Sequence, residues 1–246
     1  MTPMTPMTAT AGRVLRQLRH DPRTIALMLV VPCVLLALLR WLYDGQPHMF
    51  DKIGGPLLGI FPFIVMFLVT SVATLRERST GTLERLLTMP IRKFDIIGGY
   101  GLAFGLVAVV QAVLATGLAI GLLGLDVAGS TWLVLLVAVL DAMLGIALGL
   151  LVSAFANTEF QAVQFMPAVV LPQFLLCGLF VPRDQMQPVL EVISDLMPLS
   201  YAVDAMNRVS NESGVDGLLL RDIGVIAGCV VAAVALGALT LRRRTR

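Results

Sequence analysis

Two long stretches without a charged residue, at residues 53–75 and 96–125, limit what this chain can fold into. A helix needs about 20 mostly apolar residues to cross a bilayer, and both stretches exceed that length. Only 14% of the 246 residues are charged, whereas soluble domains carry roughly 25%. We therefore expect an integral membrane protein.

Apolar segments recur along the chain and give six candidate spans, at residues 25–42, 56–75, 98–122, 132–155, 165–180 and 223–241. Backbone groups inside a bilayer must bond to one another, and the segments lack the period-two alternation of barrel strands, so we expect helices. The predicted fold is an all-α integral membrane protein. A single transmembrane domain is expected over residues 11–246, behind a disordered tail of Thr-Pro-Met repeats at residues 1–10.

The positions of the basic residues predict the topology. Most of the 18 Lys and Arg residues precede the first span, follow the second or follow the sixth. Because cytoplasmic segments carry the excess of Lys and Arg, we expect both termini and the loop after span two in the cytoplasm. The basic stretch RVLRQLRHDPR, with Val14, Leu15 and Leu18 on one face, predicts a helix lying along the inner interface.

The fifth span and the polar stretch behind it are irregular. Pro167 and Pro172 interrupt the span, and a broken backbone is not tolerated against lipid, so we expect this helix to face protein or a cavity. The stretch between spans five and six is too polar to cross the membrane, yet its apolar residues recur at helical spacing. It predicts two short external or re-entrant helices, broken by Pro198.

The segment RERSTGTLERLLTMP, residues 76–90, interrupts the apolar pattern with charged residues. Thr82 is a suitable helix N-cap, Glu84 then lies in the first turn, and Pro90 ends the helix. One apolar face is predicted, formed by Leu83, Leu86 and Leu87. We expect a cytoplasmic helix of about two turns, which either docks into a groove of a partner or lies on the lipid surface.

Catalytic motifs are absent from the sequence. It holds no G-x-x-x-x-G-K-[ST] phosphate loop, no H-E-x-x-H and no G-x-S-x-G, and its lysines are Lys52 and Lys93 alone. We therefore expect no enzyme activity, no catalytic residue, and no metal site or cofactor in this chain. If the protein uses energy, a partner or an ion gradient has to supply it.

The charged segment resembles the motif R-E-[KR]-x-x-G-T-L-E-x-L-L-x-x-P of bacterial ABC-2 type transporter permeases. The matching residues are Arg76-Glu77-Arg78, Gly81-Thr82-Leu83-Glu84, Leu86-Leu87 and Pro90. A looser match lies at Phe180, Pro182, Ile193-Ser194 and Pro198-Leu199-Ser200-Tyr201. In the family an arginine often follows the next Asp-Ala-aliphatic run directly. Here Asn207 takes that place and Arg208 comes next, so we assign no role to Arg208.

The resemblance implies the membrane subunit of an ATP-driven exporter in the bacterial cytoplasmic membrane. It also implies a second permease, identical or related, and two copies of a separate P-loop ATPase that binds ATP and Mg. The segment after span two would be the coupling helix seated in the ATPase. Its interface residues would be Glu77, Gly81, Thr82, Leu83, Glu84, Leu86, Leu87 and Pro90. Membrane lipids are the other expected partners, and nucleic acid is not one.

Three polar residues interrupt the spans, namely Gln111, Asp141 and Gln173. Gln111 and Asp141 fall at similar depth in neighbouring antiparallel spans. We expect Asp141 to form a hydrogen bond with Gln111, or to face the substrate path or the partner permease. A charged carboxylate there costs roughly 2.5–3.5 kcal/mol on insertion scales unless it is paired or neutralised. The simpler interpretation is an interhelical hydrogen bond without a role in transport.

Two other classes of function fit the sequence. A gradient-driven transporter would use Asp141 as a proton carrier, which explains the missing ATP site but not the charged helix. A membrane scaffold would use that helix only to recruit a soluble protein. Aromatic residues in the spans suit a hydrophobic or amphipathic cargo. The sequence leaves open which substrate is carried and whether the two permeases are identical.

Overall fold

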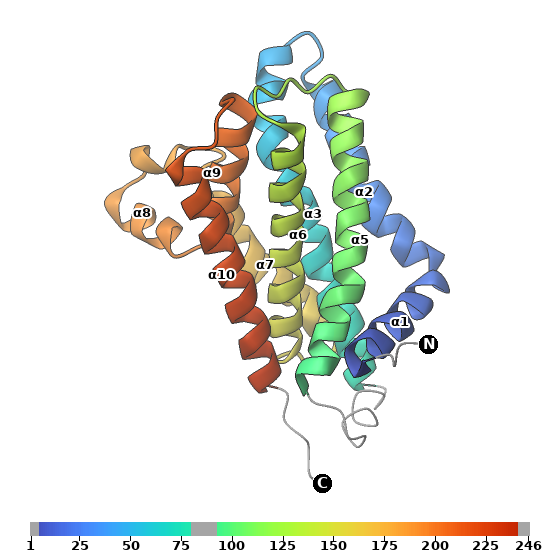
Figure 1. Cartoon of the computed structure of the whole chain (residues 1–246). Helices are drawn as coiled ribbons and strands as arrows, with labels where there is room; N and C mark the ends of the chain where they lie inside the picture. Colours follow the sequence, from blue (N-terminus) through green and yellow to red (C-terminus); the bar gives the residue numbers. More distant parts are fainter. Residues whose placement is uncertain (1–4, 80–92, 241–246) are drawn as a thin grey trace.

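The computed structural model describes residues 5–79 and 93–240, and the regular elements in those ranges are all helical, as predicted (Figure 1). The helices, labelled as in Figure 1, are α1 Pro6–Arg19, α2 Pro22–Leu42, α3 Pro47–Ser79, α5 Lys93–Gly121, α6 Thr131–Ser153, α7 Glu159–Leu176, α8 Pro188–Asp195, α9 Pro198–Asn211 and α10 Gly217–Thr240. A short 3₁₀ helix, Arg183–Gln185, precedes α8.

Five of these helices, α2, α3, α5, α6 and α10, are long and apolar enough to cross a membrane. They coincide with five of the six predicted spans. The fifth predicted span corresponds to α7, which begins before it and ends at Leu176, so residues 177–180 lie beyond the helix. The glutamines and prolines within α7 lower its hydropathy, and it is not among the five. A sixth span therefore stays a prediction.

The centre of the bundle is formed by α3 and α6, which lie side by side (Figure 1). A Cβ atom on Gly145 would lie 2.3 Å from the carbonyl oxygen of Phe63, and one on Gly149 would lie 2.6 Å from that of Phe67. Any larger residue would collide there, so these glycines let the two backbones touch. Small residues spaced four apart allow such packing in membranes, where burying apolar side chains away from lipid gains little.

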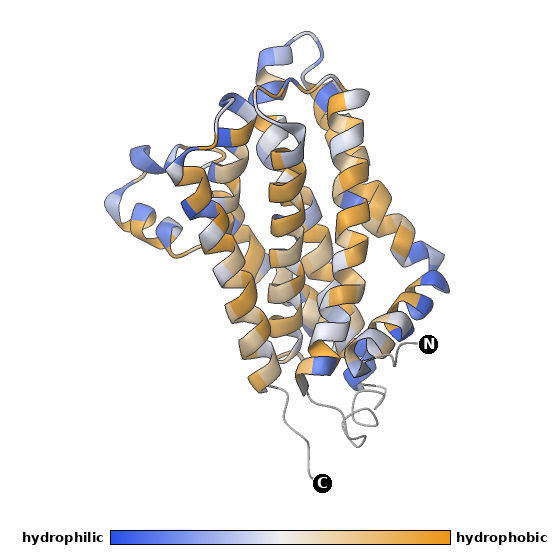
Figure 2. Cartoon of the chain, in the orientation of Figure 1, coloured by the Kyte–Doolittle hydropathy of each residue, from blue (hydrophilic) through white to orange (hydrophobic). Residues whose placement is uncertain are grey.

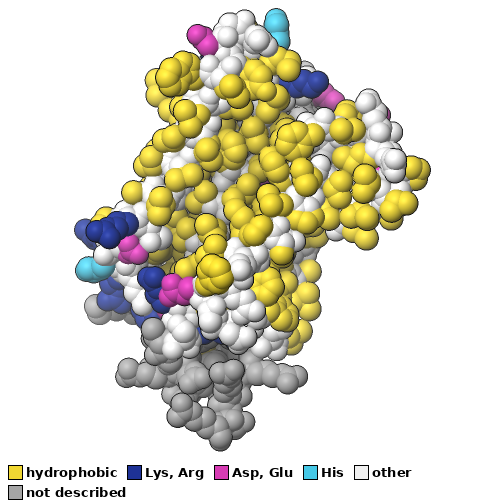
Figure 3. Space-filling view, turned by 180° about the vertical axis from the view of Figure 1, so that it is seen from behind, with side chains coloured by type: hydrophobic (Ala, Val, Ile, Leu, Met, Phe, Trp, Pro, Cys, Tyr) yellow, Lys and Arg dark blue, Asp and Glu magenta, His cyan; other side chains and the backbone are white. Residues whose placement is uncertain are grey.

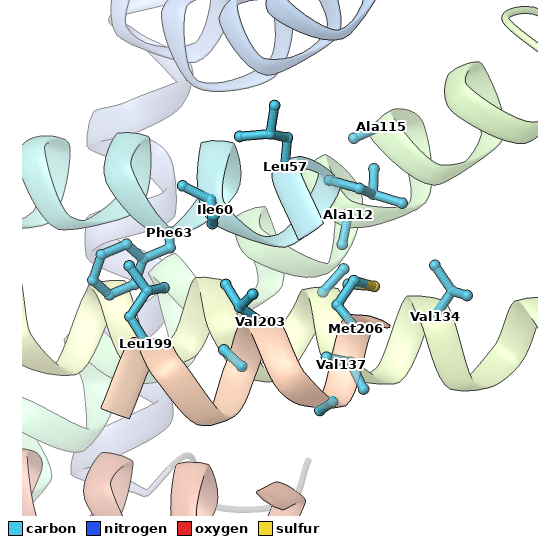
Figure 4. Packing of buried hydrophobic residues seen from close by; sticks show 14 of the residues in the cluster. Leu57, Ile60, Phe63, Ala112, Ala115, Val134, Val137, Leu199, Val203 and Met206 are labelled. Atoms are coloured by element: carbon cyan, nitrogen blue, oxygen red, sulfur yellow. The ribbon is translucent and has the colours of Figure 1, made fainter. Parts of the chain in front are cut away.

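Apolar side chains extend this contact to α9. Figure 4 shows the three helices meeting through Leu57, Ile60 and Phe63 of α3, Val134 and Val137 of α6, and Leu199, Val203 and Met206 of α9. Two short helices, α8 and α9, follow each other here as the sequence predicted, and Pro198 is the first residue of the second. The helix α9 buries its apolar face, which carries Leu199, Val203 and Met206, inside the bundle.

The amphipathic helix α1 begins at Pro6, with Thr5 as its N-cap. The backbone N–H of Thr8 donates to the side-chain oxygen of Thr5 over 3.4 Å. The helix therefore includes residues 6–10, which we had expected in a disordered tail, and Thr10 is buried. Its apolar face, which includes Val14 and Leu18, packs against α5. The predicted helix exists, and its apolar face is covered by protein.

An apolar belt surrounds the bundle. Figure 2 shows hydrophobic residues along the middle of the long helices and hydrophilic residues near both ends. Large side chains in this belt are exposed, among them Leu106 at 55% and Val231 at 69%. Figure 3 shows the opposite face of the molecule, where an apolar surface also lies between two ends that carry charged side chains. Soluble monomers rarely expose contiguous apolar patches of this extent, so the belt fits a bilayer.

We predict that Gly145→Ala destabilises the bundle by about 1–3 kcal/mol, because the new methyl group collides with the backbone of Phe63, which cannot rotate away. Gly105→Ala in α5 is the matched control, since a Cβ atom there meets nothing within 4 Å. Thermal unfolding in detergent measures both. Equal melting temperatures for the two variants would contradict the close approach of α3 and α6.

Candidate functional site

The last turn of α3 carries the sequence Arg76-Glu77-Arg78, and each of these residues contacts a different part of the bundle. Successive residues on a helix point about 100° apart, so three in a row project on three sides. In the described residues, Arg76 bonds to α7, Glu77 to α1 and α5, and Arg78 to α6. We call these three residues the inner junction.

Glu77 lies at the centre of the inner junction. Arg13 of α1 donates to both of its carboxylate oxygens, from Nη1 to Oε1 over 3.2 Å and from Nη2 to Oε2 over 2.9 Å. The Tyr100 hydroxyl of α5 also donates to Oε2 of Glu77, and it accepts a bond of 2.9 Å from Nη2 of Arg13. The side chains of Arg13 and Glu77 are 25% and 15% exposed. A bidentate pair with this little exposure fixes geometry as well as charge.

The two arginines of the inner junction bond to α7 and α6. Nε of Arg76 donates to Oε1 of Glu159, in the first turn of α7, over 3.1 Å. Both of these side chains are exposed, so the pair adds little stability. Arg78 donates to the backbone carbonyl of Ser153, the last residue of α6. A basic side chain at that position satisfies a carbonyl that the helix itself leaves unpaired.

Most of the predicted coupling residues follow this junction directly. Glu77 lies within the described residues, and its carboxylate bonds to Arg13 and Tyr100 of the same chain. The others, Gly81, Thr82, Leu83, Glu84, Leu86, Leu87 and Pro90, lie outside the described residues. Their role at a partner interface stays a prediction. The pair of Glu77 with Arg13 could not be predicted from the sequence, because the two residues are 64 positions apart.

The three polar residues within the spans do not form hydrogen bonds with one another in the described part of the chain. Nε2 of Gln111 donates to the carbonyl of Met28 in α2 over 2.6 Å, and that of Gln173 donates to Val169 in its own helix over 3.1 Å. The predicted hydrogen bond between Gln111 and Asp141 was therefore wrong. Equal depth in the membrane does not place two side chains on facing sides of their helices.

Asp141 lies where α6 meets α3 and α9, and only 1% of its surface is exposed. A Cβ atom on Gly59 of α3 would lie 2.9 Å from Oδ2 of Asp141 and 3.4 Å from the terminal methyl group of Met206. The glycine thus leaves the space that the carboxyl group fills. Oδ1 has no hydrogen-bond partner in the described part of the chain. The side chain points into the bundle rather than towards its outer surface.

A second charged cluster joins α8, α9 and α10, and the sequence did not reveal its pairs. Arg183 bonds to Asp195 and to Asp204, the latter over 2.5 Å. Its guanidinium carbon also lies 5.0 Å from the centre of the Tyr201 ring. Burial raises the pKa of the Asp204 carboxyl, and the charge of Arg183 opposes this rise. The cluster connects the last residue of α8 to the middle of α9.

Arg208, to which we assigned no role, belongs to the same cluster. It bonds to Asp216 over 3.1 Å, and its Nε lies 3.5 Å from Oδ2 of Asp222 in α10. Asp222 is fully buried and also accepts a bond of 2.7 Å from Arg221. The many Asp and Arg residues between spans five and six were the feature of the sequence from which a charged cluster could have been predicted. Partners up to 21 positions apart could not be matched from it.

The fold and the charged clusters together define the class of protein. The chain is a multi-pass helical membrane protein with two short helices, α8 and α9, and a charged motif at the end of α3 that bonds to four other helices. Over residues 7–209 it matches the ABC-2 type transporter family, and it belongs to that family. The match agrees with the resemblance that residues 76–90 carry. It also accounts for the absence of a phosphate loop, since permeases of this family are membrane components and not the ATPase.

Several curated relatives are named as permeases. The inner membrane transport permease YhhJ of Escherichia coli is 32% identical over 158 residues, which are 63% of this chain and 42% of YhhJ. The probable multidrug ABC transporter permease YbhR of Escherichia coli is 28% identical over 153 residues, 62% of this chain and 42% of YbhR. The linearmycin resistance permease protein LnrN of Bacillus subtilis is 23% identical over 175 residues, 71% of this chain and 44% of LnrN. The chain spans less than half the length of these relatives.

We predict that Arg13 and Glu77 are energetically coupled. Arg13→Met and Glu77→Gln each leave a charge without its partner, so the double variant should be more stable than the two single losses imply. The expected coupling energy is about 0.5–3 kcal/mol in a double-mutant cycle measured by unfolding in detergent. Arg16→Met is the control, because Arg16 lies on the exposed face of α1. Strictly additive losses would contradict the assigned contact.

Proposed function

We propose that this chain is the permease subunit of an ATP-driven exporter. It would form the substrate path with a second permease, and two copies of a separate P-loop ATPase would bind ATP and Mg and drive it. The observation that carries this proposal is the inner junction. Residues 80–92 leave α3 at a point that is bonded to α1, α5, α6 and α7. A partner that moves this segment therefore acts on several helix ends at once.

The source of energy is inferred from the sequence and from the relatives. The 246 residues hold no phosphate loop, so ATP hydrolysis requires another polypeptide or region. YbhR is described as an ABC transporter permease, which is a subunit that works with an ATPase. In this proposal Gly81, Thr82 and Glu84 are interface residues, and Leu83, Leu86 and Leu87 anchor the helix in the ATPase. The chain itself is then not an enzyme.

The surface of α7 supports a second permease. Pro167 and Pro172 lie on its exposed side, as do Leu171 at 48% and Leu175 at 59%. We expected this interrupted helix to face protein. One face of α7, which includes Val170 and Gln173, packs against the bundle, and the side with the two prolines is uncovered within the described residues. Because proline lacks an amide donor, a carbonyl group of the helix stays unpaired, which is unfavourable against lipid. We therefore favour a partner permease as the protein that covers this side of α7. A second copy of this chain and a related permease both satisfy the requirement.

The proposed orientation places the inner junction and both termini at the cytoplasmic face of a bacterial cytoplasmic membrane. The basic residues before span one and after span two favour this side. The cargo is proposed to be hydrophobic or amphipathic. Support comes from the relatives, whose names refer to multidrug transport and to linearmycin resistance.

We predict that replacing both Leu83 and Leu86 by Asp abolishes co-purification of the ATPase, because two charges would enter the apolar face that anchors the helix. The test is affinity purification of the tagged chain from its own host, followed by detection of a P-loop ATPase. Thr88→Asp serves as the control, since Thr88 is outside the i, i+3, i+4 apolar pattern. An ATPase that binds the double variant as tightly as the parent would refute the assigned interface.

A further inference from the structure

A cavity of about 470 Å³ lies between α1, α2, α3 and α5. Its volume falls in the range of roughly 300–1,000 Å³ that is typical of ligand sites. Side chains of these four helices form nearly all of the wall, and Val163 of α7 completes it. The proposed transport function does not use this cavity.

The wall of the cavity is apolar at one end and polar at the other. Its apolar residues lie at least one turn inside the helices and include Leu27, Leu68, Val69 and Phe104. Its charged residues lie at helix ends, since Asp21 directly precedes α2 and Arg76 and Glu77 belong to the last turn of α3. Figure 3 shows charged side chains of both signs at one end of the bundle, with apolar surface beyond them. A ligand that fills the cavity therefore needs an apolar body and a polar group.

The charged side chains of the wall carry one net negative charge, because they are the carboxylates of Asp21 and Glu77 and the guanidinium of Arg76. Glu77 pairs with Arg13, and Arg76 pairs with Glu159. Neither partner lines the cavity, and together they add one charge of each sign. Within the described residues, the charge that stays unneutralised at the polar end is therefore that of Asp21.

The Asp21 carboxylate has room for a cation. It accepts bonds from the hydroxyl and the N–H of Thr24, over 2.7 and 3.2 Å, and a carboxylate offers about four acceptor positions. These bonds, together with the more distant charge of Arg76, lower the pKa of Asp21, so the group is ionised at neutral pH. Among the residues that the structure describes, no cationic side chain forms a salt bridge with Asp21.

We propose that the cavity binds an amphipathic organic cation, of the alkylammonium type. The cationic group lies at the Asp21 carboxylate, and the apolar body lies between Leu27, Leu68 and Phe104. An anionic ligand would meet the same carboxylate unfavourably, and a neutral one would leave it without a counter-ion. The inference does not depend on the proposed export function, because binding to the purified chain requires neither ATP nor a second subunit.

Titration calorimetry of the full chain in phosphatidylcholine nanodiscs tests the charge preference. The probes are octyltrimethylammonium, octanoate and 1-octanol at neutral pH and low ionic strength, and the heat measured with empty nanodiscs is subtracted. The parent should bind the cation about fivefold more tightly than octanoate, which is the upper range for one exposed charge pair. Equal affinities for the two ions would overturn the proposal.

Substitution of Asp21 locates the charge that selects the ligand. Asp21→Asn keeps a side chain that caps helices well, so it should weaken the cation about fivefold and leave 1-octanol unchanged. Asp44→Asn is the matched control, because it removes the same charge beyond the other end of α2, away from the cavity wall. Equal losses of cation binding in both variants would overturn the role of Asp21, as would an equal loss of cation and 1-octanol in Asp21→Asn.

Filling the cavity locates the binding. Ala73→Phe, or Val72→Phe if the first variant fails to fold, should abolish binding of both the cation and 1-octanol, since both residues line the cavity. Val231→Phe is the control, because Val231 is 69% exposed on α10 and is not a lining residue. Parent-level binding of the cation in a folded cavity-filling variant would overturn the site.

Discussion

The arrangement of this chain depends on the contact between α3 and α6, whose backbones touch at Gly145 and Gly149. Lipid is as apolar as the side chains it surrounds, so helices in a membrane gain stability mainly from close packing and hydrogen bonds. This contact holds α3 at the centre, with α9 packed beside it through Met206. Because α3 is one helix from Pro47 to Ser79, its fixed position also determines where the inner junction projects.

The inner junction connects the end of α3 to four other helices. Glu77 is held by Arg13 and Tyr100, and Arg78 bonds to the end of α6. The motif that resembles the permease family thus has two parts with different tasks. Its first three residues bond to the membrane helices, and in the proposed function the residues from Gly81 onward contact the ATPase. This division explains why charged residues follow an apolar span directly. Glu77 thus has partners within the chain, and its place at a partner interface stays a prediction.

Much of the fold follows from hydropathy, because a long charge-free stretch in a bilayer has few alternatives to a helix. The boundary between α8 and α9 was likewise predictable from Pro198, since a helix cannot readily continue through a proline. The partners of polar side chains were not predictable. Whether Gln111 reaches Met28 or Asp141, and whether Arg208 reaches Asp222, depends on how helices rotate and cross, which hydropathy does not encode.

The coupling role of the inner junction is tested most directly by Glu77→Gln in vesicles that contain the chain and its ATPase. The account predicts that the ATPase stays bound and still hydrolyses ATP, while ATP-driven export falls strongly, because α1 and α5 are no longer held to the end of α3. Export at the parent rate by this variant would contradict the account. So would export that a proton gradient drives in the absence of ATP.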